Sequence, residues 1–201
     1  MLSVLIVAEE PSLYRELEEC LINDFQLEFA TRLPTNVVDL NRIEFSFEVV
    51  FYLKQLTYAE LPSVLRLTKQ KVMIFEIHSE ENFPVKVSKL VPVAERVVLR
   101  ASAMRGRIEY YRGVDEIAAL NARHMECEEN AEVILNGDAT MKAYIGDIVF
   151  RVGKNIVFGV RKDNVAVFSA DVFSNEPMSE GDNCRFLKNL LSSMLGSAEL
   201  M

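Results

Sequence analysis

The sequence lacks the features that mark membrane, secreted and zinc-binding proteins. It has no apolar run of about 18 residues and no basic segment before its first apolar run, so neither a membrane span nor a signal peptide is indicated. Its three cysteines, Cys20, Cys127 and Cys184, are widely spaced and form no C-x-x-C pair. We therefore expect neither a disulfide framework nor a zinc site, and we expect a reducing, cytoplasmic compartment.

Basic residues are too few and too scattered for a nucleic-acid-binding protein. The 22 Lys and Arg residues stand against 30 Asp and Glu residues, which gives a formal net charge of −8 at pH 7. The densest basic segment, Arg96 to Arg112, is diluted by apolar residues. Because neutralising phosphates requires clustered Lys and Arg, we expect no nucleic-acid partner.

Signs of a multidomain or cofactor-dependent protein are also absent. The sequence contains no internal repeat, low-complexity tract or linker-like segment, and no cofactor-binding or metal-binding motif. We therefore expect one α/β domain over residues 1–201, with no cofactor and no metal. Hydrophobic residues make up 50% of the chain, which is ordinary for a soluble globular protein and sufficient for a core.

Strand and helix patterns alternate over residues 1–80. Apolar runs predict strands at Leu2–Val7, Phe25–Ala30, Phe47–Leu53 and Val72–Ile77. Helices are predicted between them, after Pro11, over Thr35–Ile43 and over Ala59–Lys69. This alternation is typical of an α/β protein with a three-layer, doubly wound and mostly parallel sheet of the flavodoxin-like type.

The middle of the chain is harder to interpret, because residues 85–113 have no clean period. Val85–Val98 contains Pro92 and fits either a broken helix or a loop followed by a strand. The patterns predict a strand at Ile108–Tyr111 and a helix over Val114–Cys127. Short β segments follow at Glu132–Leu135, Lys142–Ile145 and Ile148–Val152. We therefore expect extra β structure around residues 105–152.

The C-terminal stretch combines a hairpin, a polar loop and a helix. Two β-type runs, Ile156–Val160 and Val165–Phe168, flank a polar turn at 161–164. A polar loop over 169–183 leads into a helix with the apolar spacing of a buried amphipathic helix, at Phe186, Leu187, Leu190, Leu191, Met194 and Leu195. In α/β sheets, a strand that leads through such a loop into a helix N-terminus is a common ligand-binding location.

Two motifs in this stretch carry a family resemblance. Residues 165–176 read V-A-V-F-S-A-D-V-F-S-N-E, and G-D-N at 181–183 opens the last helix, which continues with F-L at 186–187 and N-L-L at 189–191. The motifs resemble the class I glutamine amidotransferase-like superfamily, and more closely its non-catalytic branch in auxiliary proteins of ABC transporters. The resemblance covers these motifs in sequence and the remainder only in topology, and it implies an amidotransferase-like fold.

The residues that catalytic members of that superfamily need are missing at the matching positions. Those members use a Cys nucleophile on a sharp turn after a strand, flanked by small residues, and a His after a late strand. Here the turn at 75–80 reads F-E-I-H-S-E, without Cys or Gly, and the late strand continues as F-S-A-D at 168–171, without His. The resemblance therefore implies a non-catalytic binding or assembly module.

The N-terminus also resembles the opening of a response-regulator receiver domain. Residues 4–17 read V-L-I-V-A-E-E-P-S-L-Y-R-E-L, in which Glu9 and Glu10 match the acidic residues that hold Mg²⁺ in receivers. Receivers also need a phosphoacceptor Asp at the end of the third strand, where this chain has Leu53 and Lys54. This resemblance implies, as an alternative, a degenerate receiver-like signalling domain.

Candidate ligand-binding residues gather where predicted strands end. Glu9 and Glu10 follow the first strand, and His78 follows the fourth. The densest polar cluster precedes the last helix and consists of Ser169, Asp171, Ser174, Asn175, Asp182 and Asn183. Helix capping and Asx turns explain part of this cluster. Its aspartates favour a small sugar-like or amide ligand over phosphate, and no residue is assigned as catalytic or as a metal ligand.

Three functions are compatible with these patterns. The leading prediction is the non-catalytic, amidotransferase-like binding or assembly module. The first alternative is a hydrolase-like enzyme with a cleft at Glu9, His78 and Asp171, and the second is the degenerate receiver-like domain.

Partners are expected to be proteins rather than nucleic acids or membranes. Edge strands favour pairing with a second copy, so a homodimer is predicted. Aromatic residues near predicted strand edges are the candidate contacts, at Phe45, Phe47, Tyr110 and Tyr111.

Overall fold

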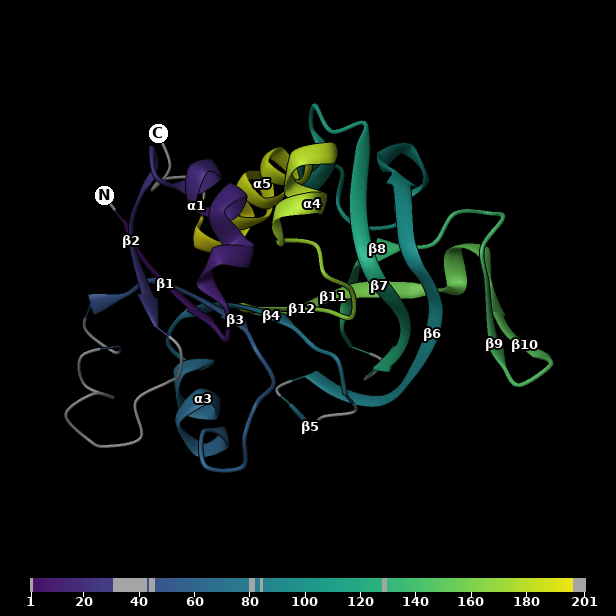
Figure 1. Cartoon of the computed structure of the whole chain (residues 1–201), viewed down its shortest axis with the longest axis horizontal. Coiled ribbons are helices and arrows are strands. Elements are labelled where there is room, and N and C mark those ends of the chain that lie inside the picture. Colours follow the sequence, from purple (N-terminus) through teal and green to yellow (C-terminus); the bar gives the residue numbers. More distant parts are fainter. Residues whose placement is uncertain are drawn as a thin grey trace.

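The structure is a computed structural model that describes residues 2–30, 43, 46–79, 82–83, 85–127 and 130–196. Its central sheet has the strand order β2–β1–β3–β4–β12–β11–β8 (Figure 1). The strand bounds are Phe25–Ala30, Leu2–Ala8, Val49–Leu53, Val72–Glu76, Val165–Phe168, Val157–Lys162 and Glu132–Asn136 in that order. The helix predicted over 35–43 lies, apart from its last residue, outside the described residues, as does Phe45.

The first five strands of this order pair in parallel, and the last two are joined to the sheet by antiparallel pairing. β1 pairs with β2 and β3, and β4 pairs with β3 and β12, all in parallel register. β11 then pairs antiparallel with β12 and with β8. The parallel part has the flavodoxin-like order, so the predicted α/β class with a mostly parallel sheet is confirmed.

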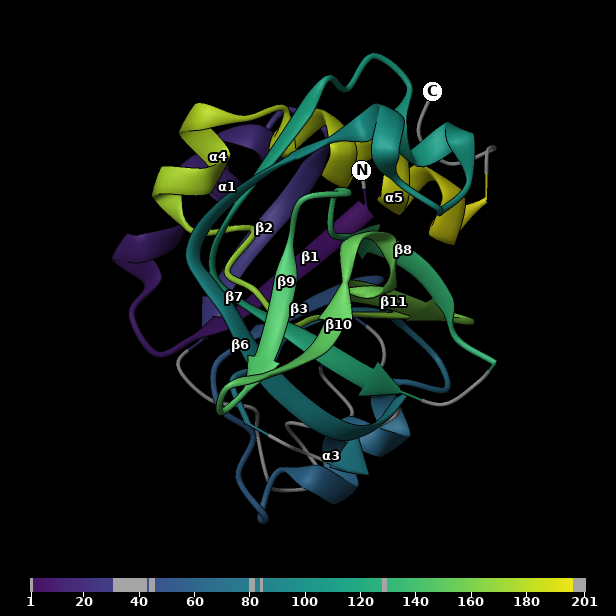
Figure 2. The same ribbon diagram turned by 90° about the vertical axis from the view of Figure 1, so that its right-hand side faces the viewer.

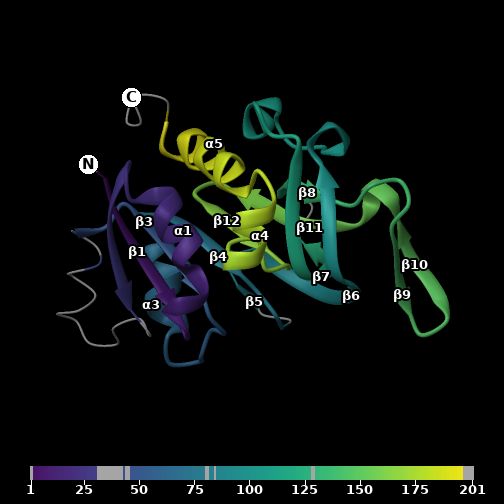
Figure 3. The ribbon, with the colours of Figure 1, turned by 45° about the horizontal axis from the view of Figure 1, so that its top comes forward.

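Helices cover both faces of the sheet and complete three layers (Figure 3). One face carries η1 (Pro11–Tyr14), α1 (Arg15–Leu21), α4 (Asn175–Glu180) and α5 (Asn183–Leu195), and the other carries α3 (Leu61–Leu67). The amphipathic C-terminal helix is confirmed as α5, which buries Phe186, Leu187, Leu190, Leu191 and Met194. Of the described helices α5 is the longest, with 13 residues, and none of them has the length and apolarity to span a bilayer.

Alternate side chains of the central strands enter two apolar cores. In β1, Val4 and Ile6 join the core that contains α1 and α5, whereas Leu5 and Val7 join the core that contains α3. Burying one such side chain contributes about 1.5–3 kcal/mol, and a one-residue slip would exchange the two faces. The strand register is therefore fixed by packing on both sides.

A long antiparallel pair differs from the sequence prediction. β6 (Val85–Arg100) and β7 (Glu116–Cys127) form a separate sheet with the short β5 (Asn82–Phe83), and both curve across the molecule (Figure 2). The helix predicted over 114–127 is therefore wrong, and 85–98 belongs to one continuous strand. Two irregularities in the β6–β7 pairing, one beside Pro92, interrupt the alternation and explain the missing period.

The connection between β6 and β7 also differs from the prediction. It contains two short 3-10 helices, η2 (Ala101–Ala103) and η3 (Ile108–Tyr111), so the strand predicted at 108–111 is wrong. Tyr110 is fully buried, and the ring of Tyr111 stacks on Phe186 of α5. The segment packs against α5 instead of pairing with a strand, so these tyrosines, like the buried Phe47, are not exposed contact residues.

A second hairpin stands apart from the central sheet. β9 (Lys142–Ile145) and β10 (Ile148–Val152) pair only with each other among the described strands, and they project from the body of the molecule (Figure 1). η4 (Gly153–Asn155) connects β10 to β11. The predicted β segments at 132–135, 142–145 and 148–152 are confirmed.

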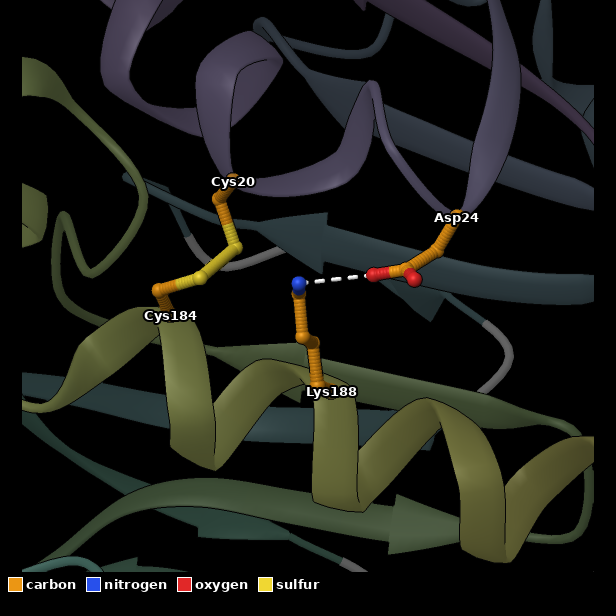
Figure 4. The surroundings of a disulfide bond; sticks show 4 residues. All are labelled: Cys20, Asp24, Cys184 and Lys188. Carbon is orange, nitrogen blue, oxygen red and sulfur yellow. Dashed lines mark ion pairs between the residues drawn. A yellow bond between two sulfur atoms is a disulfide. The ribbon is translucent and has the colours of Figure 1, made fainter. Parts of the chain in front are cut away.

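A disulfide joins α1 to α5, contrary to the expectation from the sequence. Cys20 and Cys184 are bonded although they lie 164 positions apart in the sequence, and the nearby ion pair between Lys188 and Asp24 spans 2.6 Å (Figure 4). The two cysteines meet because both helices pack on the same face of the sheet, which cysteine spacing does not reveal. Cys127 in β7 takes no part in a disulfide.

Candidate functional site

A cavity of about 580 Å³ lies at the carboxyl ends of the parallel strands. The end of β3 contributes to its lining, as do the segments that follow β1, β4 and β12 and the start of α4. Six of the predicted ligand-binding residues line it, namely Glu9, Glu10, His78, Asp171, Ser174 and Asn175. The structure therefore brings together side chains from distant parts of the sequence at the edge where open α/β sheets bind ligands.

The other three predicted residues connect the loop to β7. Ser169 and Asn183 are fully buried, and both hydrogen bond to backbone groups of β7. Asp182 accepts hydrogen bonds from two backbone N–H groups, those of Asp115 at 2.8 Å and Glu116 at 3.3 Å. None of the three lines the cavity, and their contacts position the polar loop and the start of α5.

His78 lies between a cation and an anion. Arg123 Nη1 lies 3.2 Å from His78 Nδ1, and because guanidinium can only donate, Nδ1 must accept. The neutral ring therefore carries its proton on Nε2, which lies 3.4 Å from Asp171 Oδ1. Both ring nitrogens are engaged by protein groups.

Asp171 is held by both its side chain and its backbone. Its Oδ2 accepts a hydrogen bond from Asn121 Nδ2 at 2.6 Å, and its backbone pairs with Leu120 of β7 in both directions. The buried Oδ1 has no hydrogen-bond partner among the described residues, so we interpret its 3.4 Å contact with His78 as electrostatic rather than as a full hydrogen bond. Asp171 thus presents a carboxylate to the cavity from a fixed backbone position.

Glu76 is a site residue that the sequence analysis missed. It ends β4 with 2% of its surface exposed, and its Oε1 accepts hydrogen bonds from the N–H groups of Val172 at 2.7 Å and Phe173 at 2.8 Å. Burial, and secondarily the charge of Asp171, raises the pKa of Glu76 to about 8, although the two N–H donors oppose the shift. Glu76 is therefore mostly protonated near pH 7.

Tyr14 separates Glu76 from the cavity. Its hydroxyl lies 3.4 Å from Glu76 Oε2 and 3.3 Å from the backbone oxygen of Leu53, and its ring lines the cavity. Burial, and then the negative charges that Glu76 and Asp171 both carry at alkaline pH, raise the pKa of Tyr14 far above its ordinary value. The cavity wall therefore carries a neutral phenol with a neutral carboxylic acid behind it.

The open part of the cavity has an excess of negative charge. Glu9 and Glu10 are exposed, and neither forms an ion pair with another described residue in the structure. Lys54 is the one lysine or arginine in the described lining, and its Nζ lies 3.0 Å from Glu60 Oε1. Burial alone would raise the pKa of Glu60, but hydrogen bonds from Thr57, Tyr52 and Lys54 outweigh it and lower the pKa to about 2.

Asn175 and Ser174 contribute differently to the site. The Asn175 amide donates to the backbone oxygen of Ser12 at 2.9 Å and accepts from the N–H of Glu16 at 3.1 Å. It therefore links α4 to the η1–α1 segment and fixes one wall of the cavity. Ser174 precedes α4 without a side-chain hydrogen bond to the helix N-terminus, so capping does not account for its hydroxyl.

None of the three cysteines lines the cavity. Cys20 and Cys184 are joined to each other, and Cys127 packs against the apolar core on the α3 side. The end of β4 carries Glu76 and the turn after it carries His78, and neither position has a thiol. Within the described ranges, no group of three or more His, Cys, Asp or Glu side chains is arranged to hold a metal ion.

The strand order and the location of the cavity define an α/β protein with an amidotransferase-like fold. A glutamine amidotransferase from Thermotoga maritima superposes with a TM-score of 0.57 over 96% of this chain and 98% of its own, at 9% identity. α-L-Fucosidase isoenzyme 2 from Paenibacillus thiaminolyticus superposes with a TM-score of 0.60 over 99% of this chain, at 11% identity. The chain spans 34% of that fucosidase, and at these identities the likeness concerns the fold alone.

A protein of Archaeoglobus fulgidus, described as uncharacterised, is 51% identical over 203 residues, and the match covers 100% of both chains. The chain belongs to the same family as this archaeal protein. No protein-family model matches the chain.

Proposed function

We propose that the protein is a non-catalytic, amidotransferase-like module that binds a small polar ligand in the cavity at the strand ends. The observation that carries this proposal is the pairing of His78 with both Arg123 and Asp171 in a cavity that no cysteine lines. The cavity has the location of an α/β ligand site, whereas its His78 and Asp171 side chains are already engaged by protein groups.

The same pairing weighs against the hydrolase alternative. A general base needs a ring nitrogen within hydrogen-bond reach of the proton that it removes. In His78, Nδ1 accepts from Arg123 and Nε2 faces Asp171, which leaves neither nitrogen directed to a substrate. We therefore assign His78 to the orientation of the cavity wall. The receiver alternative has no support at the end of β3, where Lys54 is paired with Glu60.

The charge of the lining favours a neutral or cationic ligand. Glu9, Glu10 and Asp171 carry negative charge at the cavity, and the charge of Lys54 is compensated by Glu60. A cavity lined by one sign of charge attracts ligands of the opposite sign and repels those of its own. The ligand classes that fit are sugars, amides and small amines, and phosphate or carboxylate ligands are disfavoured.

The proposal is tested by native mass spectrometry of the purified protein together with thermal unfolding against sugars, amides, amines and inorganic phosphate. We expect at least one compound of the first three classes to raise the melting temperature by about 5 °C near 100 times its Kd, and phosphate to have no effect. The double variant Glu9→Gln/Glu10→Gln should weaken binding of an amine about tenfold.

The matched control is Glu19→Gln/Glu109→Gln, which removes the same charge from exposed positions outside the cavity. It should bind like the wild type. Stabilisation by phosphate, or no retained mass and no stabilising compound in any class, would contradict the ligand proposal. Release of ammonia from glutamine, or turnover of a bound compound, would contradict the non-catalytic assignment.

A further inference from the structure

Exposed apolar side chains concentrate on the β9–β10 hairpin, residues 142–152, which we call the arm. Its large exposed residues are Tyr144, Ile145, Ile148, Val149 and Val152, with exposed fractions between 41% and 73%. Single exposed apolar residues are ordinary on protein surfaces, but contiguous patches of several hundred Å² mark interaction sites. The arm gathers several such side chains within eleven residues, at a distance from the ligand cavity, and shares no lining residue with it.

The outer half of the arm is apolar on both faces. Neighbouring residues of a strand point to opposite faces, so Tyr144 and Ile145 lie on different sides of the hairpin, as do Ile148 and Val149. All four are exposed. An isolated two-stranded hairpin is only marginally stable in water. In the outer half of the arm, the apolar side chains on both faces are left exposed to solvent instead of packing against another element.

The base of the arm, in contrast, is fixed to the body. Ala143 is fully buried, and the ring of Phe150 packs near His124 of β7 with the Lys89 Nζ 4.5 Å above it. Arg151 Nη2 forms an ion pair with Glu126 of β7 at 2.5 Å. The arm is therefore a hairpin whose base is packed against the body and whose tip is exposed.

The edge of β10 is open to another strand. β10 pairs with β9 and with no other strand in the described part of the chain, and β9 is the strand that contacts β6. Natural edge strands are protected by Lys, Pro, β-bulges or inward-pointing charges, and β10 reads I-V-F-R-V, without Lys or Pro. Its single charge, Arg151, is engaged by Glu126 and by the backbone oxygen of Phe150. The one irregularity of the pairing lies between Val149 and Arg151, so these protective contacts are at the base and the edge at Ile148 and Val149 stays open.

We propose that the arm associates with the arm of a second copy of this chain, β10 against β10, around a two-fold axis. An open edge is self-complementary in antiparallel pairing, so the same Ile148–Val152 run serves both partners. Five side chains about half exposed leave roughly 400–500 Å² of apolar area per arm, which sets an upper limit of about 1,000 Å² for the apolar area that two arms can bury. That limit is near the lower bound for a specific interface, so we expect a weak, reversible dimer.

The test is sedimentation velocity of the full chain from about 1 µM to about 1 mM, combined with hydrogen exchange at both ends of that range. We expect a monomer–dimer equilibrium, with slower exchange of the β10 amides at the higher concentration. Ile148→Lys and Val149→Lys place a charge on opposite faces of the exposed half, and each should raise the dimer Kd at least about tenfold.

Ile108→Lys is the matched control, because Ile108 is 85% exposed in η3 and lies outside the arm. It should dimerise like the wild type, and all variants should keep the wild-type melting temperature. A wild type that stays monomeric over the whole range overturns the proposal, whatever else the arm binds. A dimer that the arm variants leave unchanged, that Ile108→Lys weakens equally, or that forms without protecting β10 amides also overturns it.

Discussion

At the scale of single residues, Glu76 combines complete burial with an ionisable group. A carboxylate in this position would lie beside Asp171 with little access to water, and protonation avoids that cost. The sequence contained a signal for this residue, because Glu76 is the single charged position in the apolar run 72–77. An isolated acid at the end of a buried strand is a better marker of a special environment than acids in exposed turns.

Glu76 should make stability dependent on pH. Its folded pKa of about 8 exceeds the ordinary value of 4.5, so its contribution to stability is complete below pH 4.5 and is lost as the pH rises through 8. Glu76→Gln mimics the protonated form and keeps an oxygen for the N–H groups of Val172 and Phe173. Relative to the wild type, the variant should gain up to about 1.4 kcal/mol of unfolding free energy per pH unit between pH 5 and 8.

Urea unfolding at a series of pH values measures this difference. Glu19→Gln, at an exposed position, serves as the control and should follow the wild-type curve. If the unfolding free energies of Glu76→Gln and the wild type change with pH in parallel, the pKa of Glu76 is not raised.

At the scale of secondary-structure elements, Asn183 links the start of α5 to β7. Its fully buried amide donates to the backbone oxygens of Ala118 at 2.8 Å and Val172 at 2.7 Å, and it accepts from the N–H of Ala118 at 2.9 Å. Three elements, α5, β7 and the loop after β12, therefore depend on one side chain. This contact also explains why G-D-N stands at this point in the sequence.

Asn183→Ala should destabilise the protein by about 2–4 kcal/mol, because it leaves buried backbone groups of Ala118 and Val172 without partners. Asn189→Ala is the comparison, since Asn189 bonds to two backbone oxygens from a partly exposed position and should cost about 1 kcal/mol. Chemical denaturation measures both values. Equal losses of unfolding free energy in the two variants would show that burial of Asn183 adds nothing to the stabilising effect of its hydrogen bonds.

The same elements show how far sequence reasoning reached. The parallel strands and α5 were predictable, because strands covered on both faces are continuous apolar runs and α5 has a regular apolar stripe. β7 was not, because its Ala, Leu, Met and Glu residues favour a helix locally while pairing with β6 over its whole length decides its structure.

This error had a consequence for the candidate site. Glu9, His78 and Asp171 could be proposed because strand ends were visible in the sequence. Asn121 and Arg123, which hold Asp171 and His78, could not, because a helix at 114–127 would not lie alongside the loop after β12. Contacts between strands distant in the sequence are the part of the site that a single sequence does not reveal.

At the scale of the whole molecule, the Cys20–Cys184 bond crosslinks almost the entire chain. Closing a loop of this length lowers the entropy of the unfolded chain and stabilises the folded state by about 5 kcal/mol in the chain-entropy model, with 2–5 kcal/mol commonly measured. Cys20→Ser/Cys184→Ser should therefore lower the melting temperature by about 10 °C. Cys127→Ser, which removes the thiol that takes no part in the disulfide, should have a much smaller effect.

Calorimetry of the three proteins, with and without reductant, measures these shifts. Reductant should lower the melting temperature of the wild type to that of the double variant, and it should leave the melting temperature of the double variant unchanged. If the wild type melts at the same temperature in both conditions, the two cysteines are not bonded in the folded protein.

The bond also closes residues 20–184 into a covalent ring. The arm and the cavity residues that follow β3, β4 and β12 belong to this ring, whereas the cavity residues from Glu9 to Tyr14 lie outside it. A protease that cuts once within the ring opens the chain but releases no fragment, and the cut molecule keeps its full mass until it meets a reductant. A cut in an exposed loop of the ring therefore does not by itself release the segment beyond the cut. In a chain of the same fold without the crosslink, only non-covalent contacts would hold the two pieces together.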